Sequence, residues 1–280
     1  MKKIIVPVDF SKPSQDAYRY ALQLAPIFEA EIEVVHAYSG SFSPSEPLVI
    51  KSGKSREQVL MDQLELFTEV SLENENSETL TKNKVKLKIL EGAVATSVIN
   101  YAKAEKAFMI VMGTTGSHDL IEKTMGSIST AVAQKAPCTV LLIPKDKSFE
   151  GWKNVLFATD YQAAEPQLLN KGIRLTRDFE AVIHLVHVNQ DDGTESVVLH
   201  EKIFNRLFEK GDPNFSFNLL SIDADSVVKG LTQYAMENDI DCIALINHRE
   251  RFWDNVLQKS TTKQMGLYTT FPLLVFQDKE

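Results

Sequence analysis

The sequence predicts an α/β protein built from two tandem doubly wound domains, each with a five-stranded parallel sheet flanked by helices. The 280 residues exceed the length of one typical domain. Apolar strand-like runs alternate with segments of helical period, which is typical of parallel strands joined by helical crossovers. The pattern occurs twice, so we predict domains at 1–146 and 152–280, joined by a short polar linker around Gly151.

The first domain is expected to alternate five strands with four helices. A continuous apolar run over 107–112 predicts a buried strand, and Ser11 followed by Pro13 predicts the N-cap and first turn of a helix. The expected strands are 3–8, 31–37, 84–90, 107–112 and 139–143, and the expected helices are 14–29, 55–75, 95–106 and 127–136.

The second domain repeats this order. In both halves the opening apolar run ends on an aspartate, Asp9 and Asp160. Two matched sets of five strands with short connections favour two doubly wound sheets over a single eight-stranded barrel. The expected strands of the second half are 154–158, 181–188, 215–221, 241–246 and 273–276.

Composition narrows the class of partner and the compartment. A net charge of −8 and an isoelectric point near 5.4 argue against nucleic acid or an anionic membrane as the main partner. No apolar run reaches the roughly 20 residues that span a bilayer. Asp9 comes too early for the core of a signal peptide, and Cys138 and Cys242 lack a CxxC partner. We therefore expect a cytoplasmic protein with two buried thiols.

The most informative motif covers residues 113–127. Gly113 and Gly116 follow a strand, and Gly126 is followed at once by Ser127 where a helix is expected to begin. Glycines in such a connection let backbone N–H groups approach a ligand, and a helix N-terminus favours a bound anion. The motif predicts a site for the phosphates of a nucleotide, with a purely structural tight turn as the alternative.

In doubly wound sheets the ligand lies beyond the carboxyl ends of the strands, where the strand order reverses. The first expected strand ends at Asp9, the second near Ala37 and the fourth at Met112 and Gly113. With a flavodoxin-like strand order, these residues would border the ligand. Asp9 has a structural alternative, because an aspartate at a strand end often caps the following turn.

The chain resembles the universal stress proteins, with two such domains in one polypeptide. The resemblance rests on the strands that close on Asp9 and Asp160, on the Gly-x2-Gly-x9-Gly-Ser spacing at 113–127, and on Ala-Pro-Cys-Thr-Val-Leu-Leu-Ile-Pro at 136–144. It implies five-stranded parallel sheets of the flavodoxin-like, adenine nucleotide alpha hydrolase-like kind. It also implies ATP, with or without Mg²⁺, in members that bind nucleotide.

Carried onto this chain, the resemblance implies an ATP site in the first domain. Three residues would border the adenine and ribose: Pro7, Asp9 and Ala37. Four would line the turn beneath the ribose and phosphates: Met112, Gly113, Thr115 and Gly116. Three would close the phosphate site at the start of the next helix: Gly126, Ser127 and Ile128.

The second domain departs from this motif. Asn247 and Glu250 stand where the first two glycines of the motif would fall, and Ser260 and Thr261 replace the glycine–serine pair. A carboxylate at Glu250 would repel phosphates, and the repulsion exceeds the roughly 1 kcal/mol expected in water at about 4 Å. We therefore expect ATP in the first half only.

The sequence does not predict an enzyme. It contains no P-loop, no Gly-x-Ser-x-Gly elbow and no His-Glu-x2-His pair. The histidines of the strands, His36, His184 and His187, are expected to be structural rather than metal ligands. The alternative to an ATP-binding stress or regulatory protein is a scaffold or small-ligand protein that works without nucleotide. The last strand of each half could pair in an intramolecular pseudo-dimer, with a homodimer as the other arrangement.

Overall fold

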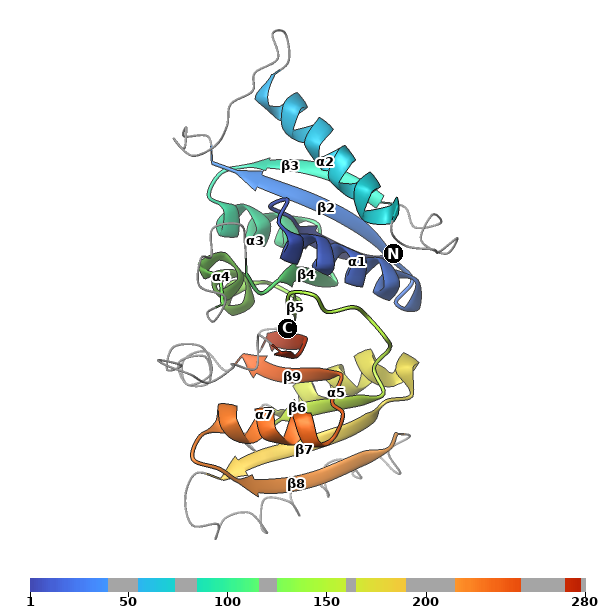
Figure 1. Cartoon of the computed structure of the whole chain (residues 1–280), viewed down its shortest axis with the longest axis vertical. Coiled ribbons are helices and arrows are strands. Elements are labelled where there is room, and N and C mark those ends of the chain that lie inside the picture. The colour runs from blue at the N-terminus through green and yellow to red at the C-terminus, as the bar shows by residue number, and fades with distance from the viewer. Residues whose placement is uncertain are drawn as a thin grey trace. The chain divides into compact units, whose positions relative to one another are not determined.

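A computed structural model describes residues 1–39, 55–73, 85–115, 125–159, 165–189, 215–247 and 270–277. The chain divides into two compact units, Met1–Phe149 and Glu150–Glu280 (Figure 1). Of the residues singled out in the sequence, five lie outside the described part: Gly116, Asp160, Glu250, Ser260 and Thr261.

Unit 1 is a parallel sheet of the strand order β3-β2-β1-β4-β5. Its elements in chain order are β1 (Lys2–Pro7), α1 (Lys12–Ile27), β2 (Ala30–Tyr38), α2 (Arg56–Glu73), β3 (Val85–Glu91), α3 (Val94–Ala104), β4 (Met109–Gly113), α4 (Ser127–Lys135) and β5 (Thr139–Ile143). These are the five strands and four helices expected, with ends that differ by a few residues. The N-cap prediction is confirmed, since the Ser11 side chain accepts from the Ser14 amide.

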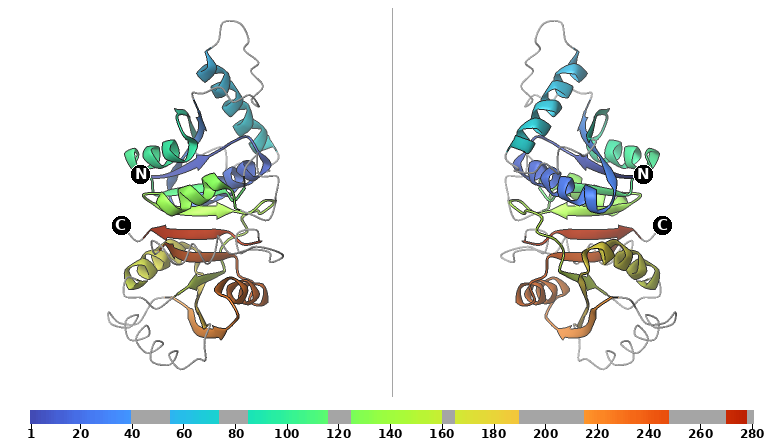
Figure 2. Two further views of the ribbon diagram at one scale, coloured as in Figure 1. Left: turned by 90° about the vertical axis from the view of Figure 1, so that its left-hand side faces the viewer. Right: turned by 90° about the vertical axis from the view of Figure 1, so that its right-hand side faces the viewer.

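The helices cover both faces of this sheet (Figure 2). α1 packs on α2 and on β4, whereas α3 packs on α4 and on the β2–β3 side of the sheet. Strands covered on both faces are expected to be continuously apolar, and all five residues of β4 and of β5 are buried. At the sheet edge β3 instead alternates, with Lys86 and Lys88 exposed.

Unit 2 repeats the same topology, because its parallel sheet has the order β10-β9-β6-β7-β8. Its described elements are β6 (Asn154–Ala158), α5 (Glu165–Thr176), η2 (Arg177–Phe179), β7 (Val182–Asn189), β8 (Phe217–Asp223), α7 (Val227–Glu237), β9 (Cys242–Asn247) and β10 (Leu273–Gln277). The five strands expected from the sequence are all present. Both doubly wound sheets of the predicted fold class are thus observed.

The two thiols are buried, Cys138 in unit 1 and Cys242 in unit 2. Burial raises the pKa of the Cys242 thiol and so lowers its thiolate fraction. None of the helices in the described part of the chain is long and apolar enough to cross a membrane.

The strand order differs from the flavodoxin-like order considered in the sequence analysis. A flavodoxin-like sheet runs 2-1-3-4-5, whereas both sheets here run 3-2-1-4-5 in their own numbering. In unit 1, β2 and β3 lie on one side of β1, and β4 and β5 lie on the other. The reversal therefore falls between β1 and β4, and this pair of strands defines where a ligand crevice can form.

A buried ion network ties β1, β2 and α3 together near the amino edge of the sheet. Glu33 is only 4% exposed. Lys3 Nζ lies 2.8 Å from a Glu33 carboxylate oxygen and also pairs with Glu105. The hydroxyl of Tyr101 donates to Glu33 over 2.9 Å. Because the buried carboxylate has both a charge partner and a donor, removal of either leaves it poorly compensated.

Two tyrosines offer opposite tests of this packing. Tyr101→Phe should lower the free energy of unfolding by about 1–2 kcal/mol, because it takes a donor from the buried Glu33 carboxylate. Tyr18→Phe should change it by no more than about 0.5 kcal/mol or raise it, since the buried Tyr18 hydroxyl has no hydrogen-bond partner within the described residues. Urea denaturation of both variants measures the contrast, and equal losses would contradict it.

The same tyrosines predict a loss of stability at alkaline pH. Burial raises the pKa of Tyr18 from 10.0 to about 12. Burial, followed by the hydrogen bond and charge of Glu33, raises the pKa of Tyr101 to about 12. The unfolded chain therefore loses these protons near pH 10 while the folded chain keeps them, so folding stability falls as the pH rises from about 10 to about 12.

Urea titrations at about pH 9, 10 and 11 measure this fall across the window in which only the unfolded chain ionises. The double variant Tyr18→Phe/Tyr101→Phe should show a shallower fall than the wild type, because it no longer carries the two titrating hydroxyls. A slope unchanged by the double substitution would assign the alkaline loss to other groups.

Candidate functional site

The candidate site lies at the carboxyl edge of the unit 1 sheet, where β1 and β4 run side by side and the strand order reverses. The two strands are in register at Ile4 with Met109 and at Ile5 with Ile110. Because they are parallel, the end of β1 and the end of β4 reach the same edge. This is the position where open α/β sheets bind their ligands.

The loop after β1 holds Asp9 in a defined turn. The Ser11 amide donates to Asp9 Oδ1 over 3.1 Å, and the Ser11 hydroxyl donates to the same oxygen. Phe10 between them has a φ of 64°, in the left-handed region that non-glycine residues seldom adopt. The Phe10 ring packs on His36 with 4.5 Å between the ring centroids. Asp9 therefore caps the turn, as its structural interpretation expected, and it is half-buried at the carboxyl edge of the sheet.

The end of β4 and the start of α4 are bonded to each other. The Gly126 amide donates to the carbonyl of Thr114 over 2.9 Å. The Ser129 hydroxyl donates to the carbonyl of Gly113 over 2.8 Å, and both groups are buried. The Thr114 amide in turn donates to the Ile143 carbonyl of β5 over 3.0 Å. These bonds bring the two ends of the 113–127 motif together, so that the strand end and the helix start form one unit.

The first turn of α4 can receive an anion. Gly126 is the N-cap in extended conformation, no side chain of the described residues caps this helix, and its first turn has no acidic residue. Ser127 and Ile128 are exposed, and Ile128 is 42% exposed. The first amides of a helix have no partner within it, and the helix dipole adds a partial positive charge there. The geometry suits a phosphate group.

The packing of Gly113 against Pro13 favours a glycine at this position. A Cβ built on Gly113 would lie 3.0 Å from the carbonyl carbon, the carbonyl oxygen and the Cβ of Pro13. A side chain at this position would be tighter than most Cβ contacts and would press on the first turn of α1. The glycine that opens the motif thus has a role in packing, whatever its role in binding.

The described residues of the predicted site share this carboxyl edge. Pro7 and Asp9 end and follow β1, Ala37 lies near the end of the neighbouring β2, and Met112 precedes Gly113 at the end of β4. Ala37 and Met112 are 8% and 6% exposed, so each offers little surface to a ligand.

Of the two remaining residues of the first glycine turn, Thr115 is described by the structure and Gly116 is not. Thr115 is half-buried and directly follows Thr114, whose carbonyl accepts from the start of α4. Gly116 lies outside the described residues. The structure therefore describes two parts of the motif, residues 113–115 at the end of β4 and Gly126, Ser127 and Ile128 at the start of α4.

Sequence reasoning missed two residues that shape the site, Thr114 and Ser129. Thr114 supplies the carbonyl that holds Gly126, and Ser129 ties α4 to β4. A serine in the first turn of a helix is a common feature and gave no signal. His36, for which the sequence predicted a structural role, donates to the carbonyl of Val8 over 2.9 Å and so contacts the loop after β1.

The two histidines of β7 have hydrogen-bond partners. His184 Nδ1 lies 2.8 Å from the Tyr234 hydroxyl, and burial lowers the pKa of His184. His187 Nδ1 lies 2.8 Å from the carbonyl of Thr159. Within the described ranges, no three His, Cys, Asp or Glu side chains gather as a metal site would need. Asn247 is the last residue of β9, at the carboxyl edge of this sheet.

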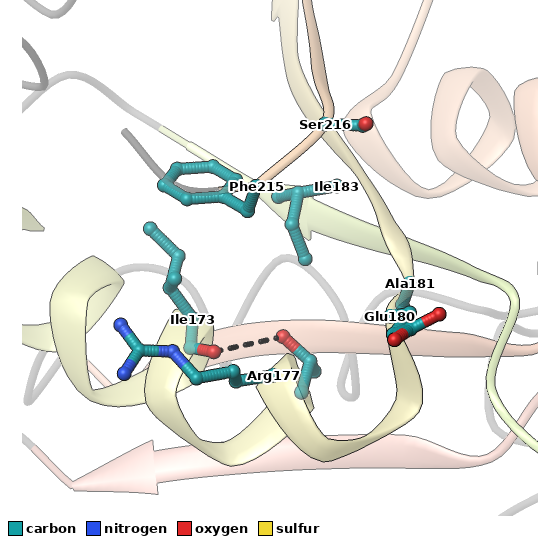
Figure 3. A pocket seen from close by; sticks show the side chains of 8 residues that line it. Ile173, Arg177, Glu180, Ala181, Ile183, Phe215 and Ser216 are labelled. Carbon is teal, nitrogen blue, oxygen red and sulfur yellow. Dashed lines mark hydrogen bonds between the residues drawn. The ribbon is translucent and has the colours of Figure 1, made fainter. Parts of the chain in front are cut away.

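A separate hollow of about 360 Å³ lies in unit 2 (Figure 3). Ile173, Ile183 and Phe215 give it an apolar wall, and Arg177 and Glu180 stand at its exposed side. Ile183 is near the start of β7 and Phe215 precedes β8. The hollow is therefore at the amino ends of the strands and is distinct from the carboxyl edge where the sequence predicts ligands.

The fold and the carboxyl-edge site define a tandem doubly wound α/β protein. The chain belongs to the universal stress protein family, whose model matches residues 1–144. It is similar to universal stress protein MJ0531 of Methanocaldococcus jannaschii, with 32% identity over 155 residues that cover 52% of this chain and 84% of that protein. It is also similar to universal stress protein A homolog 1 of Coxiella burnetii, with 31% identity over 51% of this chain and 95% of that protein.

Solved structures extend the likeness in fold to both units. A universal stress protein from Archaeoglobus fulgidus matches 98% of this chain and 96% of its own with a TM-score of 0.66 and 17% identity. A second structure is a universal stress protein in complex with cAMP, which matches 52% of this chain and 98% of its own at a TM-score of 0.39 and 19% identity. The bound cAMP was observed in that protein.

The packing of Gly113 yields a prediction for the fold. Gly113→Ala should lower the free energy of unfolding by about 1–3 kcal/mol without any nucleotide present, because its Cβ meets the backbone of Pro13. Urea denaturation measures the loss. Ser127→Ala at an exposed position is the matched control and should stay within about 0.5 kcal/mol of the wild type. A Gly113→Ala variant as stable as that control would contradict the packing role.

Proposed function

We propose that this universal stress protein binds ATP in unit 1 and acts in stress response through the occupancy of that site. One observation carries the proposal. The uncapped first turn of α4, without an acidic residue, is held by the Gly126–Thr114 and Ser129–Gly113 bonds at the strand-order reversal, on the edge where Asp9 also lies. This edge therefore combines an anion site with a hydroxyl acceptor.

Some of the described site residues would contact the phosphates of ATP, and others would contact its ribose and adenine. The amides of Ser127 and Ile128 and the Ser127 hydroxyl would donate to phosphate oxygens. The Asp9 carboxylate would accept from ribose hydroxyls, since a carboxylate accepts several hydrogen bonds. Pro7 and Ala37 would border the adenine. Mg²⁺, when present, would be held mainly by the phosphates and water.

Binding rather than catalysis is the proposed role. The motif contains no lysine placed as in a P-loop, and the described residues around it supply a carboxylate already engaged in a turn. A bound nucleotide would act by ordering the carboxyl edge and changing what partner proteins meet there. We also propose a cytoplasmic location, which fits the two buried thiols.

Unit 2 is proposed to lack ATP. The family model matches the first 144 residues, and the sequence of unit 2 replaces the motif glycines with Asn247 and Glu250. An added carboxylate repels a triphosphate. The second candidate function is a scaffold that works without nucleotide, and the Pro13 packing of Gly113 favours it because that glycine has a structural reason to be present.

Calorimetry with MgATP on the purified full-length chain decides between the two functions. The proposal expects saturable heat with one site per chain and a rise in melting temperature, since a ligand that binds only the folded state stabilises it. No heat and no thermal shift at millimolar MgATP would leave the scaffold function. Two sites per chain would mean that unit 2 also binds.

Ser127→Glu gives a sharper prediction about the phosphate end. A carboxylate in the first turn of α4 favours the helix through its dipole, so folding should be preserved, but it repels the phosphates. ATP affinity should fall at least about tenfold by calorimetry. Ser127→Ala removes the hydroxyl without adding charge and should weaken binding by only about twofold to tenfold. Equal affinities for the glutamate variant and wild type would place the phosphates elsewhere.

A further inference from the structure

The two halves share a histidine bond that the 113–127 motif does not include. His36 Nδ1 lies 2.9 Å from the Val8 carbonyl, and His187 Nδ1 lies 2.8 Å from the Thr159 carbonyl. The strand register makes the two bonds equivalent. His36 follows the partner of Pro7 in β2, and His187 follows the partner of Ala158 in β7.

In each half, the residue after the first strand is hydrogen-bonded to the second strand through both its N–H and its carbonyl. The Val8 amide donates to the Val35 carbonyl over 2.9 Å, and the Thr159 amide donates to the Val186 carbonyl over 3.0 Å. The carbonyl of the same residue then accepts from the histidine, just beyond the end of the strand pairing. Backbone groups at a strand end need such partners once the ladder stops. The histidine therefore extends the hydrogen bonding between the first and second strands by one residue.

The bond fixes the chemistry of the imidazole. A carbonyl oxygen can only accept, so Nδ1 of His36 must carry a proton. In the neutral ring this makes Nε2 the acceptor nitrogen. The Phe10 ring packs on the same imidazole, with centroids 4.5 Å apart. His36 thus contacts the loop on both sides of Asp9, through the carbonyl of the residue before it and the ring of the residue after it.

We propose that His36 is the positioning residue of the candidate site: it anchors the Val8–Asp9 peptide and so holds the Asp9 carboxylate where the ribose would bind. This inference rests on the proposed ATP function. In the sequence Thr159 also precedes an aspartate, Asp160, so the anchoring device belongs to both halves while the intact glycine motif belongs to the first. An anchored carboxylate binds more tightly because less loop freedom is lost on binding.

Three substitutions separate the donor from the ring and from general stability. His36→Phe keeps a ring against Phe10 but removes the donor, whereas His36→Asn keeps a donor near the place of Nδ1 and removes the ring. His187→Phe is the matched control, because it deletes the equivalent bond in unit 2. His36→Leu replaces His36→Phe should the latter fail to fold.

MgATP affinity by calorimetry is the first measurement. His36→Phe should weaken ATP binding about fivefold to tenfold, the range expected from one lost hydrogen bond. His36→Asn should stay within about twofold to threefold of wild type, and His187→Phe should bind as wild type does although it loses a similar bond. Wild-type affinity in the donor-less His36 variant, or an equal loss in His187→Phe, would overturn the positioning role.

Amide hydrogen exchange at Ser11, whose N–H donates to Asp9 Oδ1, is the second measurement and needs no nucleotide. Exchange should be at least about fivefold faster in His36→Phe and unchanged in His187→Phe. Unchanged protection in His36→Phe would overturn the anchoring even where ATP binding weakens. A wild type that binds no ATP refutes the proposed function and the ribose role, while faster exchange in His36→Phe would still show that His36 anchors the loop.

Discussion

The constraint on which the molecule depends is that all strands of each sheet run parallel. Each connection must then carry the chain back across the sheet through a helix, and every strand delivers its carboxyl end to one edge. In unit 1 the order 3-2-1-4-5 sends the chain first to one side of β1 and then to the other. The connections after β1 and β4 diverge to opposite faces, and the space between them is the candidate site.

Close packing at this reversal explains the glycine at the end of β4. α1 starts directly over that strand end, and a Cβ on Gly113 would lie only 3.0 Å from Pro13. The first turns of α1 and α4 share this edge, and α4 is held to the end of β4 by the Ser129–Gly113 and Gly126–Thr114 hydrogen bonds. Packing and the candidate site therefore share Gly113, so this glycine alone cannot separate a nucleotide-binding protein from a scaffold.

The comparison of the two units shows which features belong to the fold and which to the site. Both units have the same strand order, and both anchor the peptide after their first strand with a histidine. The glycine–serine pair that opens α4 at Gly126 has no counterpart in the second half, where Ser260 and Thr261 stand. The halves therefore share the histidine bond that supports the first loop, and they differ in sequence at the glycine–serine pair on which the proposed anion site depends.

Local patterns were enough to predict the alternation of strands and helices, the Ser11 cap and the two matched halves, because apolar periodicity and capping are local properties. They also placed Asp9, Gly113 and Ser127 at strand and helix ends that share one edge. The strand order, the contact of Gly113 with Pro13, and the hydrogen bonds of His36 and Ser129 became visible in the folded chain alone. These join residues distant in sequence, and such contacts depend on which strands become neighbours, a choice that local sequence patterns do not encode.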